Sequence, residues 1–426
     1  MGLRQGALGD VGRQVMDSSP RTEPGPSGLP TRPCPVCGSV QHEVLYKQRF
    51  EHFTAGSITD AYDVVVCRTC GMCFASGLPD GQRFAQYYAD SSKYDLGAEG
   101  AQLSVRDIDR YSDQARFAAA QVVDRTVPVL DVGTATGGFL VALREAGFER
   151  PFGVDPSPDA VRVARDAFNL DVIVGGLDEA KAWGYEFGLV SYVAVLEHVL
   201  EPRQQVREVS RLLRRDGFLF VSVPAAASFK DHIDAPFQEF SVEHINYFTS
   251  RSLANAMGAE GFTPVAEHVV VLPLGSDGHG PALEAVYRWD GIVRSPQPDP
   301  TGADDIRDYI RRCGSAEAST LERIERLASS GKPIYVWGTG THTLHLLQTS
   351  RLGDCRIEAF LDSNSHYAGG VLAGRPVIAP SDLLVANAPI LVSSAVSQSS
   401  IAEAARKRFG PDVPLILLYG VADGPD

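Results

Sequence analysis

The chain has 426 residues and a formal net charge of −14, a length that predicts about three domains and a charge that argues against nucleic-acid or anionic-membrane partners. Its apolar runs fall short of the roughly 20 residues that span a bilayer. Seven cysteines, five of them between Cys34 and Cys73, are too unevenly placed for a secreted disulfide framework, so we expect a cytoplasmic protein.

The first eighty residues divide into a leader and a metal-binding segment. Residues 1–32 are rich in Gly, Pro, Ser and Arg and lack the apolar core of a signal peptide, so we expect a disordered leader. Residues 33–80 contain two C-x-x-C-G motifs, whose cysteines are Cys34, Cys37, Cys67 and Cys70. Four thiolates leave no open position on a tetrahedral metal ion. These residues therefore predict a zinc ribbon with a structural zinc ion.

Three tyrosines follow the metal-binding segment. Tyr87 and Tyr88 come soon after Phe84, and Tyr94 follows a few residues later. Their hydroxyls would face a substrate if this segment formed a lid. Alternatively, Tyr87 and Tyr88 are the aromatic anchors of an amphipathic helix. We take Tyr88 as the catalytic candidate, although the sequence does not choose among the three.

A nucleotide-binding turn is the strongest signal further along the chain. Residues 129–140 form an apolar run, a turn of small residues and a helical pattern, which predicts strand, tight turn and helix. Gly133 and Gly137 would let the backbone approach a ligand. The next strand ends at Asp155, whose carboxylate would accept hydrogen bonds from a ribose. A dinucleotide site is less favoured, because Ala135 interrupts the G-x-G-x-x-G pattern.

The residues of this turn resemble the first motif of class I S-adenosylmethionine (SAM)-dependent methyltransferases, an acid followed by x-G-x-G-x-G. The acid is Asp131, and Ala135 departs mildly from the pattern. The resemblance implies SAM as the cofactor, with Asp131 near its amino-acid portion. The cofactor-binding residues expected from this resemblance and from the turn are Asp131, Gly133, Thr134, Gly137, Asp155 and, near the adenine, Asp178.

A second motif follows the strand predicted for residues 187–196. Leu196, Glu197 and His198 resemble the L-E-H motif of the same enzymes. Ligands of α/β sheets bind at the carboxyl ends of the strands, so we expect Glu197 and His198 near the cofactor. Either side chain could instead cap or hydrogen-bond the helix that follows.

Residues 235–249 concentrate polar and titratable groups in a loop after the fifth strand. Such a loop would cover the methyl-donor pocket, and substrate chemistry commonly lies on loops. His244 has the proton affinity of a general base if an acid such as Glu243 orients it. The alternative is structural, because Thr249 begins a helix with a capping hydroxyl and His244 would pack its entry.

The last third of the chain predicts a further α/β unit. Residues 275–303 are rich in Gly, Pro and Asp and read as a connection with a helical patch at residues 283–289. Residues 333–344 again predict strand, turn and helix, and the following strand ends at Asp362. This unit would either bind a nucleotide itself or only contribute a wall to the substrate site.

The order of these parts resembles the three-domain deoxysugar C-methyltransferases over nearly the whole chain after Pro33. The resemblance implies an α/β protein with an N-terminal zinc ribbon (33–80), a central class I Rossmann-like methyltransferase domain (81–275) and a C-terminal Rossmann-like substrate-side domain (276–426). It also implies a small-molecule acceptor, a nucleotide-linked keto sugar, with His244 as general base and Glu243 beside it. The tyrosine that this family has upstream of its SAM domain has no clear match here. The sequence of residues 337–343 also departs from the sequence that is usual in the family.

The reaction that the resemblance implies is enolate chemistry. His244 would remove a proton α to a carbonyl, and the enolate carbon would attack the sulfonium methyl. The residues do not choose among C, O and N as the methyl acceptor, so O- or N-methylation of a sugar or natural-product intermediate stays open. A zinc-ribbon regulator that binds SAM without catalysis is a more distant alternative, and the oligomeric state is left open.

Overall fold

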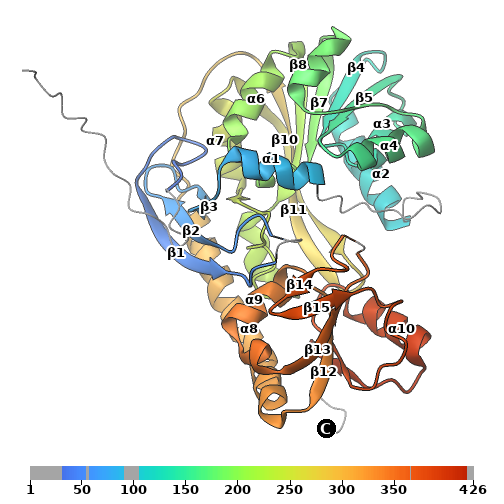
Figure 1. The fold of residues 1–426 in the computed structure, drawn as a ribbon. Helices are drawn as coiled ribbons and strands as arrows, with labels where there is room; N and C mark the ends of the chain where they lie inside the picture. Colours follow the sequence, from blue (N-terminus) through green and yellow to red (C-terminus); the bar gives the residue numbers. More distant parts are fainter. Residues whose placement is uncertain (1–30, 54–56, 91–104, 365, 420–426) are drawn as a thin grey trace, which may run out of the picture.

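Three β-sheets organise the computed structural model, which describes residues 31–53, 57–90, 105–364 and 366–419. The first sheet lies at the side of the molecule, the second fills the upper half and the third the lower half (Figure 1). The α/β class predicted from the sequence is confirmed. Residues 1–30 of the expected leader and Tyr94 lie outside the described residues.

The N-terminal sheet is antiparallel and combines residues that are far apart in the sequence. Its strands are β1 (His42–Arg49), β2 (Ala61–Cys67), β3 (Cys73–Ser76) and β9 (Asn246–Tyr247), in that order. Strand β9 belongs to the loop predicted to cover the methyl-donor pocket, and it pairs with β3 through Tyr247 and Cys73. The N-terminal sheet therefore fixes one end of that loop.

The central sheet has seven strands in the order β10-β11-β8-β7-β4-β5-β6. Its parallel strands are β4 (Pro128–Val132), β5 (Arg150–Asp155), β6 (Asp171–Val174), β7 (Phe187–Val193) and β8 (Leu213–Pro224). The chain runs outward from β4 to β6 and then returns to β7 on the other side of β4. This reversal opens a crevice at the carboxyl ends of β4 and β7, where α/β sheets bind ligands.

Helices cover both faces of the central sheet. One core cluster joins the sheet to α2 (Val105–Ala119), α3 (Gly138–Glu145) and α4 (Pro158–Phe168), and another joins it to α5 (Leu177–Ala180), α6 (Pro202–Ser210) and α7 (Ser250–Gly258). Val129 packs in the first cluster and Leu130 in the second. A strand covered on both faces needs apolar residues on both sides of the sheet, and β4 follows this pattern except at Asp131. The hydroxyl of Thr249 caps α7, as the sequence predicts.

Two long antiparallel strands extend the central sheet and correct one expectation. The helical patch predicted at residues 283–289 is wrong, because these residues belong to β11 (Gly278–Trp289), which pairs with β8 and with β10 (Phe262–Leu274). Apolar residues from Ala282 to Tyr287 are buried on both faces of the sheet. A short, mainly apolar run does not distinguish a buried strand from a helix.

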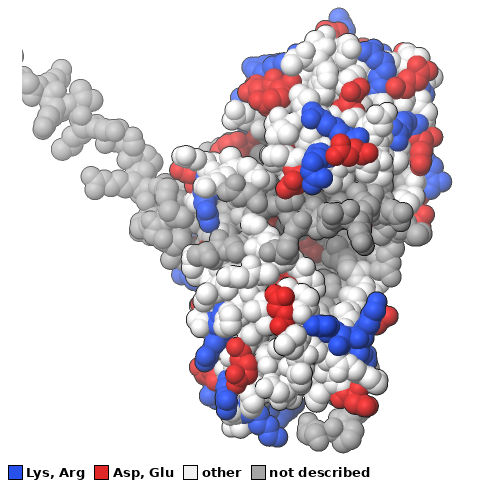
Figure 2. Space-filling view, turned by 45° about the vertical axis from the view of Figure 1, so that its right-hand side comes forward, with Lys and Arg blue, Asp and Glu red and all other residues white. Residues whose placement is uncertain are grey.

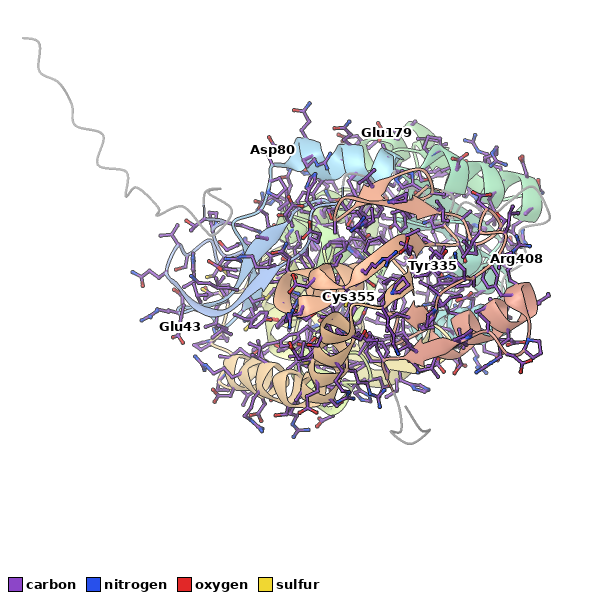
Figure 3. The ribbon with its side chains drawn as sticks, turned by 60° about the horizontal axis from the view of Figure 1, so that its bottom comes forward. Glu43, Asp80, Glu179, Tyr335, Cys355 and Arg408 are labelled. Carbon is purple, nitrogen blue, oxygen red and sulfur yellow. The ribbon has the colours of Figure 1, made fainter. Side chains whose placement is uncertain are left out.

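The C-terminal sheet has the order β14-β15-β13-β12-β16-β17. Its strands are β12 (Pro333–Trp337), β13 (Arg356–Leu361), β14 (Val371–Leu372), β15 (Arg375–Ile378), β16 (Ile390–Val392) and β17 (Leu415–Leu417). Its helices are α8 (Gly302–Ser330), α9 (Thr341–Thr349) and α10 (Gln398–Phe409). Helix α10, which carries Arg408, lies beside the sheet that carries Tyr335 (Figure 3). Strands β13, β12, β16 and β17 are parallel, and the order reverses between β12 and β16.

The N-terminal sheet and the C-terminal part share one hydrophobic cluster. It contains Phe50 and Tyr62 from the first sheet, Phe240 from the loop before β9, and Ile306 and Val336 from the C-terminal part. Acidic and basic side chains are interspersed over the face seen in Figure 2. None of the helices within the described ranges combines the length and the apolar composition that crossing a bilayer requires.

Candidate functional site

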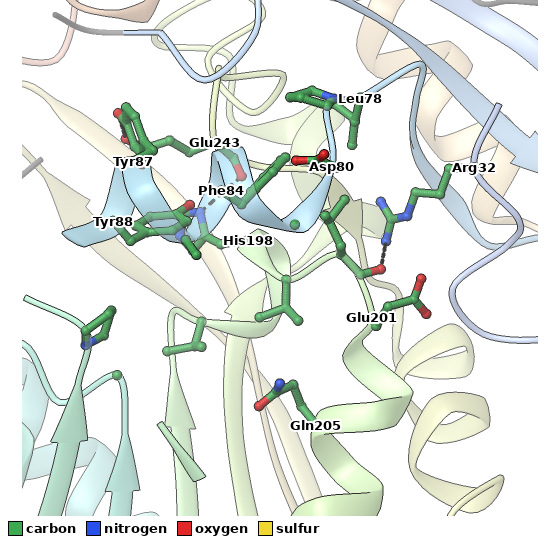
Figure 4. Close-up of a pocket in the computed structure, with 18 of the residues that line it drawn as sticks. Arg32, Leu78, Asp80, Phe84, Tyr87, Tyr88, His198, Glu201, Gln205 and Glu243 are labelled. Carbon is green, nitrogen blue, oxygen red and sulfur yellow. Dashed lines mark hydrogen bonds between the residues drawn. The ribbon is translucent and has the colours of Figure 1, made fainter. Parts of the chain in front are cut away.

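A cavity of about 880 Å³ opens at the crevice between β4 and β7. Gly133, Ala135 and Asp155 line it. So do His198 and Glu243, which Figure 4 shows. Helix α1 (Gly81–Asp90) runs across the cavity and contributes aromatic side chains to it, Phe84, Tyr87 and Tyr88. The cavity therefore lies where the sequence places the cofactor turn, at a topological switch point of the sheet.

The turn after β4 is held open by backbone conformation and by the acid after β5. Gly133 and Ala135 both have positive φ, of 74° and 49°. The Asp155 carboxylate accepts a hydrogen bond from the Ala135 N–H at 2.7 Å and another from the Ser157 N–H at 2.8 Å. Burial raises the pKa of Asp155 above its usual range. Since a carboxylate oxygen accepts more than one hydrogen bond, Asp155 keeps acceptor capacity for hydroxyls.

Other predicted cofactor residues support the turn without lining the cavity. Asp131 is 2% exposed and accepts a hydrogen bond from the Ser191 hydroxyl at 2.6 Å, and burial raises its pKa to about 7. A Cβ on Gly137 would lie 2.4 Å from Leu170. The Thr134 N–H donates to the Val154 carbonyl. These residues shape the turn rather than face the space beside it.

Asp178 is placed away from the cavity. It begins the short helix α5, its side chain is 83% exposed, and its carboxylate forms an ion pair with Lys181 at 2.6 Å. The expected contact with the adenine therefore finds no support in the structure. The family pattern predicts only a loop position, and a shift of a few residues at a helix start turns a side chain outward.

A cluster of acids and imidazoles adjoins the cavity, and two of its members, His198 and Glu243, line it. Its members are Glu197 and His198 from the short helix η2 (Leu196–His198) and Glu243 and His244 from the loop before β9. The rings of His198 and His244 have centroids 5.0 Å apart. Nδ1 of His198 lies 3.1 Å from the Glu243 carbonyl oxygen, and the Ile245 N–H donates to the Glu197 carbonyl at 2.8 Å.

The two tyrosines of α1 differ in what they contact. The Tyr87 hydroxyl donates to the Glu243 carboxylate at 2.7 Å. Tyr88 is packed edge-on to His198, with ring centroids 6.0 Å apart. Burial raises the pKa of both phenols well above the usual value, so both are neutral hydroxyls at physiological pH. The sequence leaves the choice among the tyrosines open, with Tyr88 as the catalytic candidate. In the structure, Tyr87 is the tyrosine that is hydrogen-bonded to the predicted catalytic pair.

A second, smaller cavity of about 220 Å³ adjoins the same loop from the other side. Residues 339–341 of the C-terminal part, at the start of α9, form one wall, and His244 forms part of the opposite wall. Tyr87 and Glu243 line both cavities. Two hydrogen bonds hold Thr339 in place, because the Asp362 carboxylate accepts from its N–H and from its hydroxyl.

Comparisons with known proteins identify the central part of the chain. The family model described as a methyltransferase domain matches residues 102–267. This range holds β4 to β8, the turn around Gly133 and the cluster at His198 and His244. The chain carries a class I SAM-dependent methyltransferase domain. No curated protein matches the sequence.

Three solved structures that are similar to this chain each cover less than half of it. A putative methyltransferase from Haloferax volcanii, in complex with the activator Trm112, is 20% identical and has a TM-score of 0.35, covering 42% of this chain and 90% of its own. A putative methyltransferase from Bacillus halodurans is 17% identical, with a TM-score of 0.35 and coverage of 42% and 98%. Magnesium protoporphyrin IX methyltransferase from Synechocystis, with bound SAM, is 17% identical, with a TM-score of 0.36 and coverage of 49% and 97%.

Four cysteines of the methyltransferase are gathered at one end of the N-terminal sheet. The Sγ atoms of Cys34 and Cys70 are 3.6 Å apart, those of Cys37 and Cys67 are 3.5 Å apart, and all four lie within 4.8 Å of one another. Thiolates placed about 2.3 Å from a tetrahedral zinc ion are separated by about 3.8 Å. The spacing of the four sulfur atoms therefore fits a zinc ion.

Arg32 links this cysteine cluster to the large cavity. It lies two residues before Cys34, and its guanidinium donates to the Leu200 carbonyl at 2.6 Å and to the Asn246 amide oxygen at 2.7 Å (Figure 4). Asn246 in turn donates to the Leu196 carbonyl at 2.8 Å. Burial lowers the pKa of Arg32 to about 10, so it is still a cation at neutral pH. The sequence analysis missed Arg32, which no motif singles out.

Proposed function

We propose that this methyltransferase transfers a methyl group from SAM in the large cavity to a small molecule in the smaller cavity. The observation that carries the proposal is that Tyr87 and Glu243 line both cavities. A donor and an acceptor bound on the two sides of these residues would be neighbours. Placing two reactants in contact and in line supplies much of the acceleration of a transfer reaction.

The proposed SAM site uses Asp155 for the ribose hydroxyls, with Gly133 and Ala135 beside the ligand. Glu197 and His198 lie near the sulfonium end, and Asp131, Thr134 and Gly137 hold the turn. Asp155→Ala is expected to weaken SAM binding about 10²- to 10⁴-fold, because two hydrogen bonds to a charged acceptor contribute about 1.5–3 kcal/mol each when made. Isothermal titration with SAM measures this change. Asp178→Ala is the matched control and should leave the affinity within about twofold.

The proposed division of the chain follows the sequence prediction, with a zinc-binding domain (33–80), a methyltransferase domain (81–275) and a substrate-side domain (276–426). The wall formed by residues 339–341 supports a substrate-side role for the last domain. These residues follow β12, beside the reversal of strand order between β12 and β16. Two switch points, one in each parallel sheet, thus open toward the loop that carries His244.

The proposed reaction is C-methylation of a nucleotide-linked keto sugar. SAM, when bound, supplies the methyl group on a sulfonium. His244 takes the proton from the carbon next to the ketone, and the electron pair of that C–H bond forms the enolate. The enolate carbon then forms a bond to the methyl group while the carbon–sulfur bond breaks. The Tyr87 hydroxyl donates its single proton to Glu243 and is a neutral group at the boundary between the two cavities. Tyr88 packs His198 in place.

The test of this function is mass spectrometry of the enzyme with SAM and a panel of nucleotide-linked 4-keto sugars and their reduced counterparts. A gain of about 14 mass units on the ketones alone, with exchange of an α-deuterium, is the expected result. A gain on the reduced sugars would instead indicate O-methylation. No gain on any sugar, with SAM bound, would contradict the acceptor class.

A second candidate role for the cluster is metal binding. Glu197, His198 and His244 bring ligand atoms to within 4.8 Å of one another. Two imidazoles and a carboxylate suit Zn²⁺ or Fe²⁺, which would polarise an acceptor oxygen. In that case a chelator that spares the cysteine site would abolish methyl transfer. In the proposed base mechanism, methyl transfer survives the chelator.

We also propose that Cys34, Cys37, Cys67 and Cys70 hold a structural zinc ion. The four-sulfur donor set leaves no position for water, so the ion would fold the N-terminal sheet rather than take part in chemistry. Through Arg32 and β9, that sheet fixes the loop that carries His244. The zinc ion would therefore stabilise the reaction site from a distance.

A further inference from the structure

Glu239 lies on the protein side of His244, opposite the smaller cavity. Its carboxylate Oε2 is 3.8 Å from Nδ1 of His244, and the residue is 6% exposed. His244 lines the cavity, whereas Glu239 does not. The Glu239 backbone N–H donates to the Tyr309 hydroxyl on α8 at 3.2 Å, which anchors this part of the loop on the C-terminal part of the chain.

Glu243, the acid next to His244 in the sequence, makes different contacts from those of Glu239. The Glu243 carboxylate accepts the Tyr87 hydroxyl at 2.7 Å and lines both cavities. The main chain turns between Ser241 and His244, because the Ser241 hydroxyl accepts hydrogen bonds from the N–H groups of Glu243 and His244 at 3.2 and 3.0 Å. Nδ1 of His244 lies 3.8 Å from the carboxylate of Glu239, the acid five residues earlier.

We propose that Glu239 is the positioning residue for His244: it accepts the Nδ1–H of the imidazole and leaves Nε2 with its lone pair directed at the acceptor. The inference rests on the proposed role of His244 as base. An acid behind an imidazole selects the tautomer and stabilises the imidazolium that forms when the base takes a proton. The distance of 3.8 Å is longer than a hydrogen bond, and such contacts tighten when the substrate binds.

The first test reads the tautomer of His244 directly, without an acceptor. In full-length enzyme labelled with ¹⁵N-histidine and saturated with S-adenosylhomocysteine, the signals lost in His244→Gln identify His244. At pH 8.5 these signals should show the Nδ1–H tautomer in the native enzyme and a shift toward Nε2–H in Glu239→Gln, whose amide donates to Nδ1. The same tautomer in both proteins would overturn the inference.

The second test measures turnover with SAM and the keto sugar that gains a methyl group. Glu239→Gln should lower kcat about 10- to 100-fold with little change in KM, and Glu239→Asp should recover part of the loss. The matched control is Glu317→Gln, since Glu317 is also buried and lies 3.5 Å from a histidine, His345, outside both cavities.

The outcomes separate this inference from the function on which it rests. If His244→Gln abolishes turnover while Glu239→Gln behaves like Glu317→Gln, with unchanged kcat, only the positioning role is overturned. If His244→Gln retains full turnover, the base assignment itself is wrong. A thermal shift of both glutamate variants identifies any loss that comes from unfolding alone.

Discussion

His244→Gln is expected to lower methyl transfer by about 10²–10⁴-fold, the contribution that a positioned general base makes to a rate. Glutamine fills much of the same space but does not take a proton at neutral pH. The readouts are methyl gain by mass spectrometry and, in D₂O with S-adenosylhomocysteine, exchange of the α-proton of the keto sugar. Both should fall together, because both need the same proton removal.

The affinity for SAM distinguishes this loss from a general defect. It should stay within about threefold in His244→Gln, since His244 lines the acceptor cavity and not the large cavity. His279→Gln is the matched control, because its ring lies on the exposed side of β11 next to Asp234. Full α-proton exchange in His244→Gln would show that another group is the base.

Cys67→Ser is expected to release the zinc ion and to destabilise the protein by several kcal/mol. A structural zinc site in a small domain contributes about 10–16 kcal/mol of binding free energy to folding, and losing one thiolate removes much of it. Cys67 closes strand β2, so the defect should reach the N-terminal sheet and, through β9, the loop with His244. Metal analysis should fall from one zinc ion per chain to well below one, and the melting temperature should drop.

Cys355→Ser provides the control for this change. Cys355 is also buried, but it lies in the C-terminal part of the chain, apart from the N-terminal sheet that carries Glu43 (Figure 3). Its zinc content should equal that of the native enzyme. Retention of one zinc ion per chain by Cys67→Ser would contradict the proposed four-thiolate site.

The sequence alone determined the central turn and the cysteine cluster. The spacing of Gly133, Gly137 and Asp155 fixes a strand, a turn and a second strand end within 27 residues, and the two cysteine pairs have the spacing of metal ligands. These features are local, because each depends on backbone conformation within one turn. The family model then matched the region that contains the turn. By contrast, the run at Leu283 was misread as helix, because its burial on both faces depends on strands elsewhere in the chain.

Only the tertiary structure decided which acid contacts Nδ1 of His244 and which tyrosine donates a hydrogen bond to Glu243. In the sequence Glu243 is adjacent to His244 and Tyr88 is as good a candidate as Tyr87, but neighbouring residues in a turn point in different directions. The fold places Glu239 beside His244 and Tyr87 beside Glu243 by packing the loop between the N-terminal sheet and helix α8. Contacts between residues 156 positions apart, such as Tyr87 and Glu243, depend on that packing and leave no periodic signal in the sequence.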